Sequence, residues 1–175
     1  MITRVRQAVS ALTARISQAD KDFVAAHLNP AEQALFWGMN LPDQRHALNV
    51  AYTAGRLADG NDRIDCPLLT KCALLHDVGK VYGDVSTADK IITVIAHRFA
   101  PHWAKRWGRP GRGNKLQNLR HAFYVYFHHP ARSAALLQQA GTAASVADIV
   151  AKHHSAPAKD DPPELEILRQ ADQQH

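Results

Sequence analysis

An apolar stretch that ends on two potential metal ligands constrains the fold of this 175-residue chain more than any other feature. It covers residues 73–80 and reads Ala-Leu-Leu-His-Asp-Val-Gly-Lys. The positions i, i+3, i+4 and i+7 of the helix that leads into it are Leu69, Cys72, Ala73 and His76, so the stripe that turns Leu69 inward also turns His76 inward. Histidine and aspartate are costly to bury without a partner, and a bound cation would compensate His76 and Asp77. Gly79 is suited to a left-handed cap at the end of this helix.

Other helical stripes also carry a histidine or an aspartate. A helix predicted from Pro42 to about Asp59 has the inner stripe His46, Val50, Thr53 and Leu57. A later stripe is Val146, Ile149, Val150 and His153, with His154 next in sequence. The last helix places Leu165, Leu168 and Asp172 on one face. His128 and His129 precede Pro130, which is predicted to start a helix. One inward histidine is common in protein cores, but a set on successive helices indicates a metal site. No stretch alternates with period two, so the sequence predicts an all-α fold.

The chain is expected to divide near residue 40. Residues 1–40 are predicted to form N-terminal helices packed on the core, including one at 2–16, and residues 41–175 to form the main domain. A basic helical insertion is expected at about 81–128, and its glycine-rich sequence at 108–113 predicts a loop.

The positive charge of the chain is concentrated in that insertion. The net charge is +5, whereas residues 81–130 hold eight Lys or Arg against two Asp, a net charge of +6. The basic segment 90–120 suits an anionic partner such as a phosphate, a nucleic acid or a membrane surface, although a solvated helical face has the same composition. Trp103 and Trp107 are one helical turn apart, and packing is favoured over stacking on a base.

No apolar run approaches the roughly 18 residues of a membrane-spanning helix. No secretory signal is recognisable at the start, so a cytoplasmic protein is expected. Cys66 and Cys72 show no metal or redox spacing and are expected to be buried apolar residues in a reducing compartment.

The order His46, His76-Asp77 and Asp172 resembles the signature of the HD-domain superfamily of metal-dependent phosphohydrolases. The fuller set is similar to the two-metal branch, in which His-Asp-(Val/Ile)-Gly-Lys is followed by a His near a Pro and then by a His-His pair. The corresponding residues are 76–80, His129-Pro130 and His153-His154. The resemblance covers about Pro42 to Asp172 and implies an HD-domain helical bundle with a basic insertion. Ser155-Ala156-Pro157 departs from the HD-GYP pattern, so a standalone HD protein outside that subfamily is expected.

The resemblance also implies a ligand set. The first metal ion would be held by His46, His76, Asp77 and Asp172. Asp77 would bridge to a second ion held by His129, His153 and His154. His128 is an alternative to His129, because a one-residue shift in register exchanges them. Imidazole and carboxylate ligands suit divalent Mn, Fe, Co, Ni or Zn, and one or two such ions are expected.

Asp77 and Lys80 are the candidate catalytic residues. Lys80 resembles the family lysine that contacts the substrate phosphate, and Arg109 and Arg112 are further candidates for phosphate binding. The resemblance implies that a metal-bound hydroxide hydrolyses a nucleotide-type phosphate ester, for example a cyclic dinucleotide. Two alternatives are a diiron oxygenase, which the HD scaffold also hosts, and a non-catalytic module that binds RNA or lipid through the basic segment. The substrate, the metal and the oligomeric state are not specified.

Overall fold

The all-α prediction is confirmed. The structure is a computed structural model, which describes residues 15–175. These residues form α2 (Gln18–His27), α3 (Pro30–Trp37), α4 (Leu41–Ala58), α5 (Cys66–Leu75), α6 (Thr87–Phe99), α7 (Pro101–Trp107), α8 (Lys115–Gln139), α9 (Ala144–Lys152) and α10 (Pro163–Gln173). Within this range the only strand-type pairing is an isolated bridge between Met39 and Val81. The helix expected at 2–16 lies almost entirely outside the described residues.

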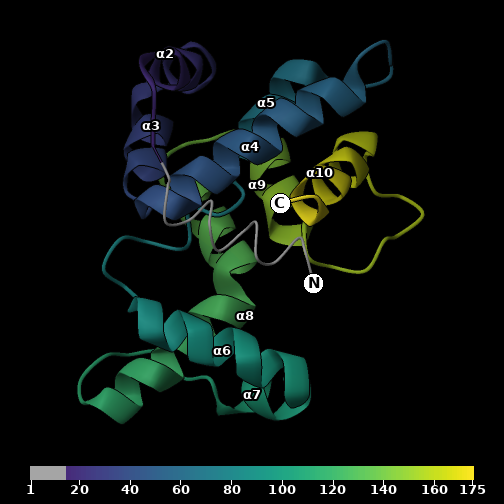
Figure 1. The fold of residues 1–175 in the computed structure, drawn as a ribbon. Helices are drawn as coiled ribbons and strands as arrows, with labels where there is room; N and C mark the ends of the chain where they lie inside the picture. Colours follow the sequence, from purple (N-terminus) through teal and green to yellow (C-terminus); the bar gives the residue numbers. More distant parts are fainter. Residues whose placement is uncertain (1–14) are drawn as a thin grey trace.

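The core is built around the pair α4 and α5. These helices pack along each other, α10 contacts both, and α9 lies between α5 and α8 (Figure 1). Leu48, Leu74 and Leu165 come from three of these helices and are fully buried. The start of α5 is capped by Asp65, whose side chain accepts a hydrogen bond from the Leu68 amide at 2.9 Å.

The helices α2 and α3 belong to the same core. Val24 and Phe36 are buried with it. Asp20 at the start of α2 accepts hydrogen bonds from Arg45 and from the Tyr52 hydroxyl, both on α4. These contacts join the N-terminal helices to the rest of the domain, and the boundary near residue 40 stays a prediction.

The helices α6 and α7 stand apart from this core. They pack on each other and on α8, at the end of α8 that points away from α4 and α5 (Figure 1). The Trp103 ring stacks on Trp107 with centroids 5.3 Å apart, and the edge of Trp107 meets Phe123 of α8 at 5.2 Å. The two tryptophans therefore pack, as predicted. Among residues 15–175 no helix is long and apolar enough to cross a membrane.

The prediction that Pro130 starts a helix was wrong. Pro130 lies inside α8, which continues without interruption from Lys115 to Gln139. The helix α8 packs along α9 and also on α6 and α7. Proline lacks an amide hydrogen, so it does not donate to the carbonyl four residues earlier in the helix.

Two burial predictions were also wrong. Leu57 was expected on the inner stripe of α4 but is 38% exposed, because the buried face of α4 runs through Val50, Ala54 and Ala58. Cys66 is exposed as the first residue of α5, whereas Cys72 is buried as expected.

Candidate metal centre

The predicted ligands are brought together by five different parts of the fold. His46 lies in the first turns of α4, and Asp172 lies near the end of α10. His76 and Asp77 follow α5, His153 and His154 follow α9, and His129 lies inside α8. Side-chain ligand atoms lie within 4.8 Å of one another in three overlapping groups, which are His46/His76/Asp172, His76/Asp77/His153 and His129/His153/His154. The seven predicted side chains therefore form one continuous cluster.

Three of the histidines are oriented by the same local device. His76 Nδ1 donates to the Ala73 carbonyl at 2.8 Å, and His153 Nδ1 donates to the Val150 carbonyl at 2.6 Å. His129 Nδ1 makes the equivalent bond to Tyr126, again three residues earlier, at 2.8 Å. A carbonyl only accepts, so each Nδ1 carries the proton and each Nε2 faces the cluster.

The positions of these histidines explain why the carbonyls are available. His76 and His153 each follow the last residue of a helix, where carbonyls lack the regular helical donor. The Val150 carbonyl also accepts a long bond, at 3.5 Å, from the His153 amide. His129 lies in the middle of α8, but Pro130 has no amide hydrogen to offer the Tyr126 carbonyl. Because Pro130 cannot donate to it, the Tyr126 carbonyl accepts from His129 Nδ1 instead.

The buried atoms of the cluster fit a metal ion. His76, Asp77, His129 and His153 are at most 4% exposed. In the described part of the chain, no hydrogen-bond donor reaches Nε2 of these three histidines or Oδ1 of Asp77. His129 Nε2 and Asp77 Oδ1 lie only 3.3 Å apart. Buried acceptors that face one another without a donor are costly, and a divalent cation removes that cost.

The electrostatics of the cluster favour the metal-binding forms of Asp77, His129 and His153, and the protonated form of His76. Burial would raise the pKa of Asp77, but Lys80 and His76 hold it well below its usual range. Burial and the neighbouring His76 lower the pKa of His153 to about 3, and burial and Lys80 lower that of His129. Burial would also lower the pKa of His76, but Asp77 and Asp172 outweigh it and raise the value to about 9. A metal ion would therefore take the place of one proton, on His76.

His129, and not its neighbour, faces the cluster. The ring centroid of His129 is 5.4 Å from that of His153. The His128 ring instead lies over Tyr124, with centroids 4.8 Å apart. The two residues point to different sides of α8, so only His129 lies beside the other predicted ligands.

Gly79 is required for close approach of the turn to α8. Its φ is not positive, so the predicted left-handed cap was wrong. A Cβ at this position would lie 2.6 Å from the His129 carbonyl oxygen and 2.8 Å from the Ser133 amide nitrogen. The Gly79 amide donates to Ser133 Oγ at 2.8 Å. The glycine thus lets the segment carrying His76 and Asp77 touch the part of α8 that carries His129.

A cavity of about 660 Å³ opens over the cluster. Lys80 lines it and donates to Asp77 Oδ2 at 2.7 Å. Its wall also contains residues that the sequence did not single out, namely His97, Lys105, Tyr126, Phe127 and His175. No stripe of the kind that identified the ligands marked these positions. Arg109 and Arg112 are exposed and are not among the described residues that line this cavity.

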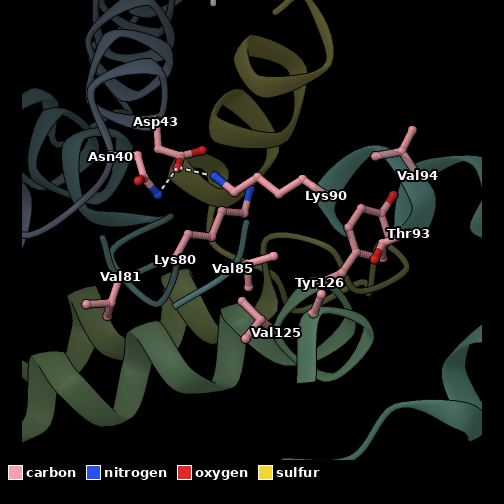
Figure 2. A pocket seen from close by; sticks show the side chains of 11 residues that line it. Asn40, Asp43, Lys80, Val81, Val85, Lys90, Thr93, Val94, Val125 and Tyr126 are labelled. Atoms are coloured by element: carbon pink, nitrogen blue, oxygen red, sulfur yellow. Dashed lines mark hydrogen bonds and ion pairs between the residues drawn. The ribbon is translucent and has the colours of Figure 1, made fainter. Parts of the chain in front are cut away.

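A second cavity, of about 160 Å³, is shown in Figure 2. Lys80 and Tyr126 line both cavities. Its walls are mainly apolar, and the side chains that form them are Val81, Val85, Thr93, Val94, Ala122 and Val125. At one end Asp43 accepts hydrogen bonds from Lys90 at 2.7 Å and from Asn40 at 3.2 Å. This cavity could not be predicted from the sequence, because its walls come from four separate segments.

The fold and the site define an all-α protein with a His/Asp centre, at the ends of several helices, that could hold divalent metal. A scan against protein-family models matched the HD domain over residues 44–175. The match covers most of the chain, and the protein belongs to the HD-domain family, whose members are generally metal-dependent hydrolases of phosphate esters. Searches of curated proteins and of solved structures returned no match.

Proposed function

We propose that this protein is a phosphohydrolase that cleaves a nucleotide-type phosphate ester with the help of one or two divalent metal ions. The proposed ligands are His46, His76, Asp77, His129, His153, His154 and Asp172. Bound divalent ions would supply Lewis acidity and a water molecule of lowered pKa. The observation that carries the proposal is the position of Lys80, between the metal-ligand cluster and the smaller cavity.

Lys80 is suited to bind the substrate phosphate. Burial would lower its pKa, but Asp77 and Asp43 raise it above the usual value, so Lys80 stays charged at neutral pH. One of its three protons is donated to Asp77. The other two are free to meet phosphate oxygens above the cluster, where they would offset negative charge that develops in the transition state.

Lys105 is the better candidate for a second phosphate contact. It lines the larger cavity together with Lys80, whereas Arg109 and Arg112 lie in the exposed loop beyond α7. We therefore propose Lys105 in place of the two arginines that the sequence favoured.

The smaller cavity is suited to the organic part of the ester. An apolar cavity of about 150 Å³ holds a single aromatic ring, and this cavity is of similar size. Asn40 and Asp43 place an amide and a carboxylate at its polar end. A planar base would find apolar walls for its faces and polar groups for its edge, which supports a nucleotide-type substrate.

The test is reconstitution of metal-free protein with Mn, Fe, Co, Ni or Zn, followed by a screen for ester cleavage. The substrates are cyclic dinucleotides, dinucleoside polyphosphates and nucleotides. Lys80→Met is expected to lower turnover by roughly 10²- to 10³-fold with metal content unchanged. Lys21→Met, at an exposed position on α2, is the control and should keep full activity.

Three results would contradict the proposal. Metal-loaded protein that cleaves none of these esters would argue against hydrolysis. Oxygen consumption with a diiron spectrum would favour an oxygenase. Salt-sensitive RNA binding that survives metal removal, without ester cleavage, would favour a binding module.

A further inference from the structure

The helix α6 has its apolar residues on the outside. Ile91, Ile95 and Phe99 follow at steps of four, and Ile92 lies beside them on the same face. These four side chains are 44–83% exposed. We call them the α6 apolar face. Of the helix's 13 residues only Thr93, on the opposite side, is buried.

Polar contacts hold the opposite side of α6 against the protein. Lys90 pairs with Asp43 of α4 at 2.7 Å, and His97 Nδ1 lies 2.7 Å from the Tyr126 hydroxyl of α8. Thr93 lies between these two positions and is 1% exposed. Rotating α6 to bury its isoleucines would break these contacts, so the exposed apolar face is built into the fold. Exposed apolar groups of this size on one face mark an interaction surface.

The surroundings of this face are positively charged. Arg98 is exposed on α6 itself, and Arg106 is exposed on α7, which packs against α6. The only acids in residues 81–130 are Asp84 and Asp89, and Asp84 is already paired with His121 and Arg132. The partner is therefore expected to combine an apolar interior with negative charge at its surface.

We propose that the α6 apolar face docks on an anionic membrane surface. A surface-lying helix has an apolar face with Lys and Arg at its edges, and α6 with its neighbours has this arrangement. Arginine chains beside the face reach the lipid headgroups, each adding attraction to an anionic leaflet. A second copy of the chain fits less well, because it would bring another segment of net charge +6 against the first. RNA also fits less well, because single strands bind by stacking on aromatic rings and three of the four side chains are isoleucine.

The test is co-sedimentation of the full chain with vesicles. We expect binding to vesicles of phosphatidylcholine mixed with phosphatidylserine, and weaker binding to phosphatidylcholine alone or at high salt. The double variant Ile95→Ser/Phe99→Ser should lower the bound fraction by roughly tenfold or more, because it removes two large apolar groups from the contact. The control Leu57→Ser, at an exposed apolar position on α4, should bind as the unmodified protein does.

A dye on the face distinguishes the possible occupants. Ile95→Cys in a Cys66→Ser background places an environment-sensitive dye on α6, since Cys72 is buried. The dye should report water in the absence of vesicles and an apolar surrounding after anionic vesicles are added. An apolar signal without vesicles, in a dimer or in a monomer, would show that protein covers the face and would overturn the proposal. Equal vesicle binding by the double variant, or binding to RNA but not to vesicles, would also overturn it. None of these measurements depends on hydrolysis.

Discussion

The helices α5 and α6 both carry a clear apolar stripe, yet they use it in opposite ways. In α5, Leu69, Cys72 and Leu75 are at most 1% exposed. In α6, Ile91, Ile95 and Phe99 are more than half exposed. A helical period therefore identifies a helix and its faces, but it does not determine which face the rest of the chain covers.

The difference comes from contacts far apart in the sequence. The neighbours of α5 are apolar faces of α4, α9 and α10, which leave no alternative to burying its leucines. The neighbours of α6 offer a carboxylate at Asp43 and a hydroxyl at Tyr126, and these take the polar side of the helix. We therefore regard the core around α4 and α5, with α8, α9 and α10, as the part that holds the ligand cluster, and α6 with α7 as the part that presents surfaces.

The largest expected effect comes from comparing two buried or paired carboxylates, Asp77 in the ligand cluster and Asp84 just before α6. Asp77→Asn keeps the shape of the side chain but removes a buried charge from the ligand cluster. Turnover should fall by at least roughly 10³-fold, as for residues that act as one catalytic unit. Metal content, measured by elemental analysis of the purified protein, should fall with it.

Asp84→Asn is the matched control. Asp84 is also paired, at 2.7 Å with His121 and at 2.6 Å with Arg132, but it lies in the segment just before α6. Its replacement should cost about 1–3 kcal/mol in the free energy of unfolding and leave metal content unchanged. Equal loss of metal in Asp77→Asn and Asp84→Asn would show that metal binding does not depend on the ligand cluster alone, which would contradict the proposed difference between the two regions.

Much of the site could be read from the sequence because its ligands end apolar stripes. His76 and His153 occupy the fourth position of an i, i+3, i+4, i+7 series, and burial of the series places them inside. His129 had no such stripe, and only the motif next to Pro130 favoured it over His128. The cavity residues His97 and Lys105 could not be identified, because their positions depend on how α6 and α7 pack against α8.

A second prediction tests the contrast between α5 and α6 directly. Leu74→Ala removes a side chain that is fully buried in α5 and should lower the free energy of unfolding by about 2–5 kcal/mol. Ile95→Ala removes a similar volume from the exposed face of α6 and should change it by less than about 0.5 kcal/mol. Urea denaturation of both variants provides the measurement. A loss above 2 kcal/mol for Ile95→Ala would mean that protein covers this face.

The fold class followed from periodicity, whereas two details depended on competing local signals. Proline is common as the first residue of a helix. Pro130 instead lies inside α8, which packs along α9. Leu57 continues the His46 stripe by spacing, but the buried face of α4 is formed by small residues such as Ala54 and Ala58. Alanine carries little hydrophobic signal, so a face built from it is hard to recognise in sequence.

The smallest expected effect compares two glycines that each touch α8. A Cβ at Gly79 would meet the His129 carbonyl oxygen at 2.6 Å, and a Cβ at Gly108 would meet the Tyr124 amide nitrogen at 2.9 Å. Gly79→Ala and Gly108→Ala should each lower the free energy of unfolding by about 1–3 kcal/mol, because the backbone must move to make room.

Only Gly79→Ala should also weaken metal binding, measured by calorimetric titration of metal-free protein, because it pushes the turn that carries Asp77 away from His129. Gly108→Ala displaces the insertion end of α8, one turn or more before His129. Equal weakening by Gly108→Ala would show that α8 transmits movement of the insertion to the ligands. The two regions would then be coupled through one continuous helix, and docking of α6 would be expected to change the metal site.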